Sequence, residues 1–443
     1  MLGLRGYNGW LPSNPHRYNG WLPSSRAVHQ AFISDLLARA TARHNRNEAH
    51  EPCVAAFDKA MNANNGLMKR LFEKTFIEAT STVMIPDYPH LLHALDVIVV
   101  SPPAVVNLAG EPAEPIGVPI YVAMDPLINT SAGYLLFTMD SFNNAMKPLL
   151  DSWGQYLKSP ASNATLTDVP DGWFGQEGIS LLQAADRGTF NNTYITPDPS
   201  AVNRGYGSWD AFFTREVQDI ARPVHPAPPG TVIYNACEST VERYVTDVQL
   251  HDKFWLKGMP YSLYDMFGGD ASQEHIARQF EGGTVYQAFL SPEDYHRWHA
   301  PVAGIIVDAY VLPGTYYAAL PDDGDDGDMR GALIRSQPWL TAAAARAVVT
   351  IKSEIFGLVC LIAVGMVEVS TCELLVKSGD PVEPGKQLGM FHFGGSSHAL
   401  IFQKHVNIAW RNPVKPGVHR KVNSILADVT ISQRLASIRD HAV

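Results

Sequence analysis

The chain has 443 residues and 46% hydrophobic residues, enough for a large buried core and about two domains. Its formal net charge of −10 and the lack of a Lys/Arg block exclude the basic surface with which proteins bind nucleic acid or an anionic bilayer. The first residues contain Trp, Pro and Asn where a signal peptide needs an apolar core, which predicts a cytoplasmic protein.

Residues 1–25 are predicted to form a flexible leader. The segment 7–13 recurs as 18–24, and two copies are too few for a repeat architecture. A helix is expected to begin after Ser24 or Ser25, either of which can cap it. Its apolar face comprises Val28, Phe32, Leu36 and Ala40.

Two further helices are predicted, at 54–79 and 133–150, each with apolar residues at helical spacing. Residues 62–66 within the first of them are prone to form a turn. This part of the chain shows neither metal-ligand spacing nor a phosphate-binding loop. We therefore predict a mostly helical N-terminal domain over 26–200.

The pattern changes after 193–206, which is rich in Pro, Asn and Gly, and Ser208 is then expected to cap a short helix. From Gly230 onward, β patterns predominate. The expected strands are 231–234, 241–248, 284–290, 305–312, 348–351 and 358–369. The predicted fold class is α+β, with the helical domain followed by a mainly antiparallel β core over 205–443.

Three other features predict no special chemistry. The apolar run 355–367 is too short to span a bilayer and suits a buried strand. The acidic segment 322–328 does not match the calcium-binding EF-hand pattern and is interpreted as a solvated loop. The cysteines lie far apart without a Cys-x-x-Cys pair and are expected to be reduced: Cys53, Cys237, Cys360 and Cys372.

Two motifs carry the chemistry: Gly-Met-Phe-His-Phe-Gly-Gly-Ser-Ser at 389–397 and Asp-Tyr-His-Arg-Trp-His-Ala-Pro at 294–301. Alone, the Gly-Gly-Ser-Ser sequence is typical of a tight turn. A serine behind glycines, with a histidine elsewhere to take its proton, indicates an activated nucleophile. His296 and His299 could instead bind a metal, but no third ligand lies nearby, so no metal site is predicted.

These motifs resemble those of the phosphatidylserine decarboxylase family, in the Gly-Gly-Ser form of its eukaryotic second class. The resemblance begins near Tyr206, and two further stretches agree with it in order: 212–216 with 221–224, and 314–317. The long helical part ahead of it has no hydrophobic anchor, C2 domain or EF-hand. It resembles the soluble fungal branch of the family, which includes the tryptophan decarboxylase of psilocybin biosynthesis.

The resemblance implies that the chain cleaves itself between Gly395 and Ser396. The hydroxyl of Ser396 attacks the Gly395 carbonyl, and elimination and hydrolysis then leave a pyruvoyl group at position 396. The two products are a β chain of residues 1–395 and an α chain of residues 396–443. Ser397 is the alternative nucleophile.

The resemblance also assigns roles to three other residues. His299 matches the general base that activates the serine, and His296 matches the histidine of the decarboxylation step. The family has an aspartate that orients the base, and alignment on the following serine puts Glu238 in its place. An alignment shifted by one residue would put Cys237 there, which could not orient a histidine.

The implied function is pyruvoyl-dependent decarboxylation of a free aromatic L-amino acid, first L-tryptophan to tryptamine and CO2, without pyridoxal phosphate. The expected partner is a small amino-acid substrate, with no nucleic acid and no stable membrane anchor; family habit favours a homodimer. The alternative enzyme would make phosphatidylethanolamine from phosphatidylserine. A third reading is a non-catalytic homologue, which would run as one band near 48.6 kDa.

Overall fold

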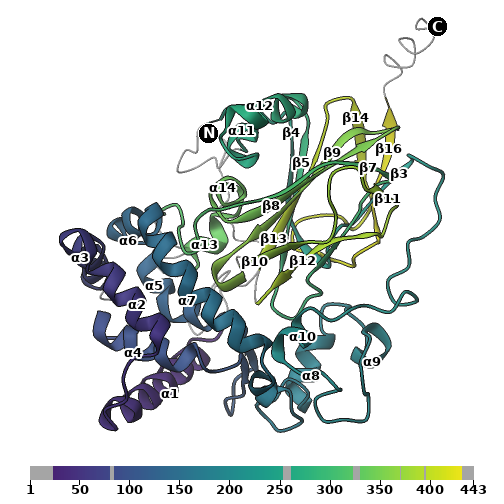
Figure 1. Ribbon diagram of the computed structural model, residues 1–443. Helices are drawn as coiled ribbons and strands as arrows, with labels where there is room; N and C mark the ends of the chain where they lie inside the picture. Colours follow the sequence, from purple (N-terminus) through teal and green to yellow (C-terminus); the bar gives the residue numbers. More distant parts are fainter. Residues whose placement is uncertain are drawn as a thin grey trace, which may run out of the picture.

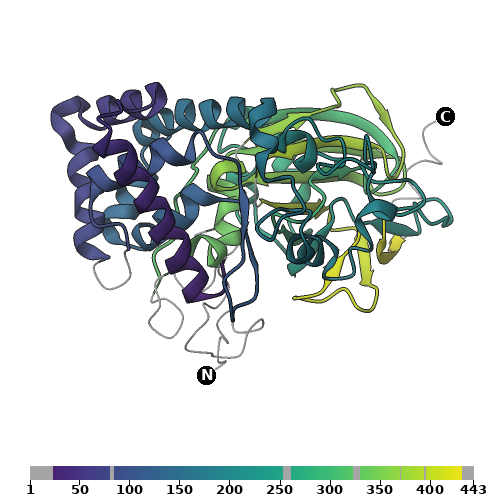
Figure 2. The same ribbon diagram turned by 90° about the horizontal axis from the view of Figure 1, so that it is seen from below.

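A computed structural model describes residues 23–79, 84–252, 261–322, 330–369, 371–393 and 396–431. The predicted leader 1–25 lies outside these residues apart from 23–25, and so do Gly395 and the acidic segment apart from Asp322. Helices gather on one side of the molecule and β-sheets on the other (Figures 1 and 2). The chain therefore has the predicted α+β class, with its helices mainly in the first half.

The first helix, α1 (Arg26–Asn45), begins where the sequence predicts. The Oγ of Ser25 accepts a hydrogen bond from the Val28 N–H at 3.3 Å, which satisfies one of the unpaired N–H groups of the first turn. Val28, Leu36 and Ala40 are buried on its inner face, and Phe32 is half-buried. The periodicity and the cap were thus sufficient to locate this helix.

Two predicted helices are each divided in the structure. The stretch 54–79 forms α2 (Pro52–Met61) and α3 (Ala63–Glu78), and positive φ angles from Asn64 to Gly66 interrupt the helical backbone within α3. The stretch 133–150 forms α6 (Ser131–Phe137) and α7 (Asp140–Lys158). α6 ends at Thr138, whose hydroxyl bonds back to the carbonyl of Tyr134 at 2.6 Å.

The helices α4 (Tyr88–Ile98) and α5 (Pro119–Ile128) were not predicted. Every residue of α5 is buried, so it lacks the polar face that produces a helical periodicity. The remaining elements of this half are β1 (Ala104–Val106), β2 (Glu114–Ile116), η1 (Pro160–Thr165), α8 (Gln176–Gln183), α9 (Phe190–Thr193) and α10 (Trp209–Phe213). Ser208 caps α10 as predicted, accepting from the Ala211 N–H at 3.1 Å.

The centre of the second half is an eight-stranded antiparallel sheet in the order β11-β7-β8-β9-β13-β5-β4-β15. Its strands are β4 (Ser239–Thr246), β5 (Thr284–Leu290), β7 (Gly304–Leu312), β8 (Arg346–Ser353), β9 (Gly357–Gly365), β11 (Pro381–Val382), β13 (Ser396–Phe402) and β15 (His419–Arg420). The predicted strand at 284–290 has its predicted bounds. The one predicted at 358–369 ends earlier, because the chain turns into η3 (Val367–Val369).

Two three-stranded sheets accompany the large one, in the orders β10-β12-β6 and β14-β16-β3. Their strands are β3 (Val232–Tyr234), β6 (Arg297–His299), β10 (Thr371–Leu374), β12 (Gln387–His392), β14 (Val406–Trp410) and β16 (Ile425–Ile431). Short helices lie beside the large sheet: α11 (Leu263–Met266), α12 (Ala271–Ala277), η2 (Arg278–Phe280), α13 (Ala332–Arg335) and α14 (Gln337–Ala343).

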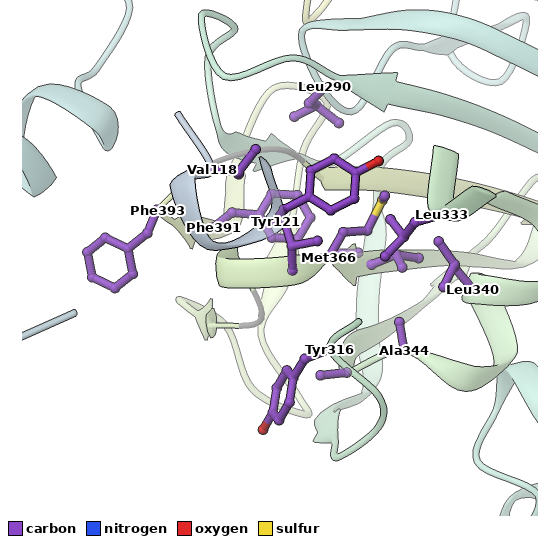
Figure 3. Close-up of a cluster of buried hydrophobic side chains, with 14 of the residues drawn as sticks. Val118, Tyr121, Leu290, Tyr316, Leu333, Leu340, Ala344, Met366, Phe391 and Phe393 are labelled. Carbon is purple, nitrogen blue, oxygen red and sulfur yellow. The ribbon is translucent and has the colours of Figure 1, made fainter. Parts of the chain in front are cut away.

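One continuous hydrophobic core joins the two halves. Figure 3 shows Tyr121 of α5 beside Met366 and Leu333, which belong to the β half. The contact is fixed by Glu368, whose Oε1 accepts hydrogen bonds from the Ile120 and Tyr121 N–H groups at 2.5 and 3.0 Å. In the part of the chain that the structure describes, no helix combines the length and the apolar character needed to cross a membrane.

Candidate active site

Ser396 is the first residue of β13, a central strand of the large sheet. It pairs with Leu290 on β5 and Gly365 on β9 and is fully buried. Side chains alternate along a strand, so Ser396 and Ser397 project to opposite faces of the sheet. The Oγ of Ser396 lies 3.5 Å from Nδ1 of His296. The Ser397 hydroxyl has no hydrogen-bond partner among the described residues, so only Ser396 is next to a candidate base.

His296 is fully buried, and its ring stacks on Phe213 of α10 with 4.0 Å between centroids. Burial disfavours the imidazolium and lowers the pKa of His296 to about 3, although Asp294 opposes this shift. The imidazole is therefore neutral at cellular pH. Its Nε2 has no hydrogen-bond partner within the described part of the chain, and Nδ1 is the nitrogen that faces position 396.

His299 is held by two other side chains. Its Nδ1 lies 3.1 Å from the Asn423 Oδ1, and its Nε2 lies 2.9 Å from the Tyr295 hydroxyl. Because the Asn423 amide N–H donates to the Arg222 carbonyl at 2.9 Å, its Oδ1 must accept from Nδ1–H of His299. Nε2 then accepts from Tyr295, and burial lowers the pKa of His299 to about 4. Neither ring nitrogen bonds Ser396.

Glu238 lies against Arg222 rather than against His299. Its carboxylate accepts from the Arg222 Nε at 2.8 Å and Nη2 at 2.5 Å, and from the Val422 N–H at 2.9 Å. The Nδ1 of His299 is held instead by Asn423, the neighbour of Val422. Glu238 therefore reaches His299 only through the 422–423 backbone and Arg222.

A buried ion pair anchors the loop that carries both histidines. Asp294 accepts from the Arg187 Nε at 2.7 Å and lies 3.0 Å from the His419 Nε2. Burial alone would raise the pKa of Asp294, but Arg187 and His419 outweigh it and hold this pKa well below its usual range. Because Asp294 is also bonded to the Ser291 N–H at 2.8 Å, the turn before β6 is fixed at both ends.

Sequence reasoning missed several residues of this site. Tyr295 lies inside the histidine motif, directly before His296 and four residues before His299, and this proximity could have suggested a contact. Asn423 lies far away in the chain, and no local pattern marks it. His398 is fully buried two residues beyond Ser396 on the same face of β13, and neither of its ring nitrogens has a partner in the described residues.

A small hollow of about 20 Å³ adjoins the start of β13. Phe289, Pro292 and Met366 line this hollow. They are close in the chain to Leu290 and Gly365, the residues that pair with Ser396, so the hollow lies at the ends of the two strands beside it. The other lining residues come from both halves of the chain: Val118, Tyr121, Leu333, Ile334 and Val367. The helical half thus contributes directly to the surroundings of position 396.

Residues 209–427 match the family model described as phosphatidylserine decarboxylase, and residues 51–182 match a second model of that description. The decarboxylase iboD of Amanita muscaria is 54% identical over 325 residues, covering 71% of this chain and 92% of the relative. The L-tryptophan decarboxylase of Psilocybe cubensis is 34% identical over 433 residues, covering 91% and 92%. A phosphatidylserine decarboxylase proenzyme of Schizosaccharomyces pombe is 29% identical over 202 residues, covering 46% and 19%.

The α+β fold, the buried serine–histidine site and these relatives define a carboxy-lyase. The chain belongs to the phosphatidylserine decarboxylase family.

Proposed function

We propose that the protein is a pyruvoyl-dependent decarboxylase of a free aromatic L-amino acid, with L-tryptophan as the first substrate. The observation that carries this proposal is the 3.5 Å contact between the Ser396 Oγ and a neutral, buried His296. The serine stands directly after two glycines at the beginning of a central strand. Glycines before the serine let the chain bend, and intramolecular attack of the Oγ on the preceding carbonyl requires such a bend.

In the proposed maturation, the Ser396 Oγ attacks the Gly395 carbonyl carbon, and the peptide bond is exchanged for an ester. Removal of the Cα proton then expels the Gly395 carboxylate and leaves dehydroalanine at position 396. Addition of water and loss of ammonia give the pyruvoyl ketone. The residues present fit this group, because position 396 is buried next to one imidazole and lies on the same face as His398.

The pyruvoyl ketone supplies an electron sink for the electron pair left when CO2 departs. His296 is placed to hold or deliver a proton at position 396, because its Nδ1 faces that residue and its ring is neutral. His299 is assigned the base of maturation, with its tautomer fixed by Asn423.

The relatives support an aromatic amino acid as substrate. Two L-tryptophan decarboxylases of the genus Psilocybe match 91% and 71% of this chain at 34% and 35% identity. The phosphatidylserine decarboxylase proenzyme of Schizosaccharomyces pombe matches 46% of it at 29% identity. The hollow beside the start of β13 has an apolar and aromatic lining, and its volume of about 20 Å³ would have to increase to admit an indole ring.

We expect the purified, matured protein to release CO2 and tryptamine from L-tryptophan, with slower release from L-tyrosine and L-phenylalanine. A hydroxyl added in an apolar pocket shifts selectivity by about a hundredfold, so L-tyrosine and L-phenylalanine, which differ by one hydroxyl, should differ by no more than that order. The assay measures CO2 from each amino acid, with phosphatidylserine in detergent micelles measured in parallel. Turnover of the lipid alone would favour the alternative function and reject the proposed one.

Glu238→Gln should slow self-cleavage less than His299→Ala does. The glutamine amide keeps the shape of the side chain and one acceptor oxygen, but Arg222 loses its buried anionic partner. Removing one partner of a buried ion pair altogether lowers the stability of a protein by roughly 3–5 kcal/mol. The 422–423 backbone and the His299 ring would then be held less firmly. The measurement is the time course of the two fragments on a denaturing gel after cell-free synthesis.

Asn423 supplies the matched comparison for this effect. Asn423→Ala removes the Oδ1 acceptor and should slow cleavage, whereas Asn423→Asp keeps an acceptor and tolerates the positive φ of 64° at this position. Thermal unfolding shows whether each variant is folded. If folded Glu238→Gln and Asn423→Ala proteins mature at the rate of the unaltered chain, neither residue positions His299.

A further inference from the structure

A group of histidines lies in the helical half, where α4 meets the connection between α1 and α2. His93 and Asp96 are on α4 three residues apart and so share a face of the helix. His50 lies in the α1–α2 connection, and His44 in the last turn of α1. Among the described residues, His50, His93 and Asp96 form a group whose ligand atoms all lie within 4.8 Å of one another.

The carboxylate at the centre of this group is already oriented. The Oδ1 of Asp96 accepts a hydrogen bond from the Glu51 N–H at 2.8 Å. Its Oδ2 faces the two imidazoles, 2.6 Å from the His50 Nδ1 and 3.7 Å from the His93 Nδ1. In proteins, a carboxylate that binds a metal ion is itself commonly held by hydrogen bonds, as the Glu51 N–H holds Asp96 here.

Three imidazole rings lie close together at this position. The His50 and His93 rings are stacked with centroids 4.8 Å apart, and the His44 ring lies edge-on to His93 at the same distance. In a neutral imidazole one ring nitrogen carries no proton, and that nitrogen can bind a metal ion.

The group is also accessible. The side chains of His50 and His93 are 33% and 27% exposed, whereas that of Asp96 is 4% exposed. The neighbouring cation Arg43 is paired with Glu51 at 2.7 Å and with Glu48 at 3.2 Å, so its charge is compensated locally. An ion can reach the imidazoles from solvent while the carboxylate behind them stays fixed.

From this arrangement we propose a site for Zn²⁺ or a similar transition-metal ion on His50, His93 and Asp96, with His44 adjacent. Two imidazole nitrogens and one carboxylate oxygen suit Zn²⁺ better than Ca²⁺ or Mg²⁺, which prefer oxygen ligands. Ligand bonds of about 2.0–2.2 Å require the three atoms to close in, which small rotations of the exposed histidines allow. The bound ion would link the α1–α2 connection to α4. This site is in the helical half of the chain, whereas Ser396 is in the large sheet.

The test is isothermal titration of ZnCl2 into tag-free, full-length protein that has been stripped with a chelator. We expect one tight Zn²⁺ site per chain. His50→Gln and His93→Gln should each weaken the Zn²⁺ affinity at least about tenfold, because loss of a group that merely hydrogen-bonds to a metal ligand already costs roughly 10–100-fold in affinity. The matched control is His90→Gln on the same helix, an exposed residue bonded to Asp87 and outside the group. It should bind like the unaltered chain.

Thermal unfolding gives a second measurement that does not depend on enzyme activity. A ligand that binds only the folded state raises the unfolding midpoint, so Zn²⁺ should stabilise the unaltered chain and His90→Gln but not His93→Gln. The midpoints without metal show whether each variant is folded. Equal Zn²⁺ affinity in His93→Gln and the unaltered chain, or no tight binding at all, would overturn the proposal.

Discussion

Ser396→Ala is expected to remain a single full-length polypeptide without decarboxylase activity. The unaltered chain should instead give fragments 1–395 and 396–443. Alanine has no oxygen to attack the preceding carbonyl, so neither the chain break nor the ketone can form. Intact mass spectrometry of the purified proteins measures both results, and the small fragment should begin with a pyruvoyl group.

Ser397→Ala is the matched control, because Ser397 is equally buried on the same strand but projects to the opposite face. It should still cleave. If the unaltered chain instead gives a small fragment that begins at position 397, Ser397 is the nucleophile. Borohydride added together with the substrate should attach the substrate to the small fragment, whereas label on a lysine of the large fragment would indicate a different cofactor.

His299→Ala is expected to block or severely slow maturation, and His296→Ala to mature but turn over substrate poorly. Loss of a general base typically costs about 10²–10⁴-fold, and the contact of His296 with position 396 suits the later proton transfer. Fragment formation and CO2 release, measured separately for each variant, distinguish the two steps. Phe213→Leu would test the stacking support of His296 without removing a titrating group.

The geometry makes the opposite result informative. His296 is the imidazole next to Ser396, while both nitrogens of His299 are engaged by Tyr295 and Asn423. If His296→Ala fails to cleave and His299→Ala cleaves normally, the nearer imidazole is the base. Since burial lowers the pKa of both histidines to about 3 and about 4, maturation should not depend on their protonation between about pH 6 and 8.

Local patterns in the sequence were enough to predict α1 with a cap at Ser24 or Ser25, of which the structure shows Ser25. They also predicted the Ser208 cap of α10 and the buried strand at 284–290. These features depend on contacts between residues close in the chain or on a simple alternation along it. The same holds for the two motifs that carry Ser396 and the histidines. α5 escaped prediction because it is buried on every side and has no amphipathic period.

The tertiary structure alone decided which side chains meet across long separations. Glu238 pairs with Arg222, while Asn423, near the end of the described chain, takes the position beside His299. The group of His50, His93 and Asp96 likewise draws its members from the α1–α2 connection and α4, which lie more than forty residues apart in the chain. The sequence by itself thus determined the reactive groups and their local elements, because those follow from neighbouring residues. Their partners depend on how distant segments pack, which no local pattern encodes.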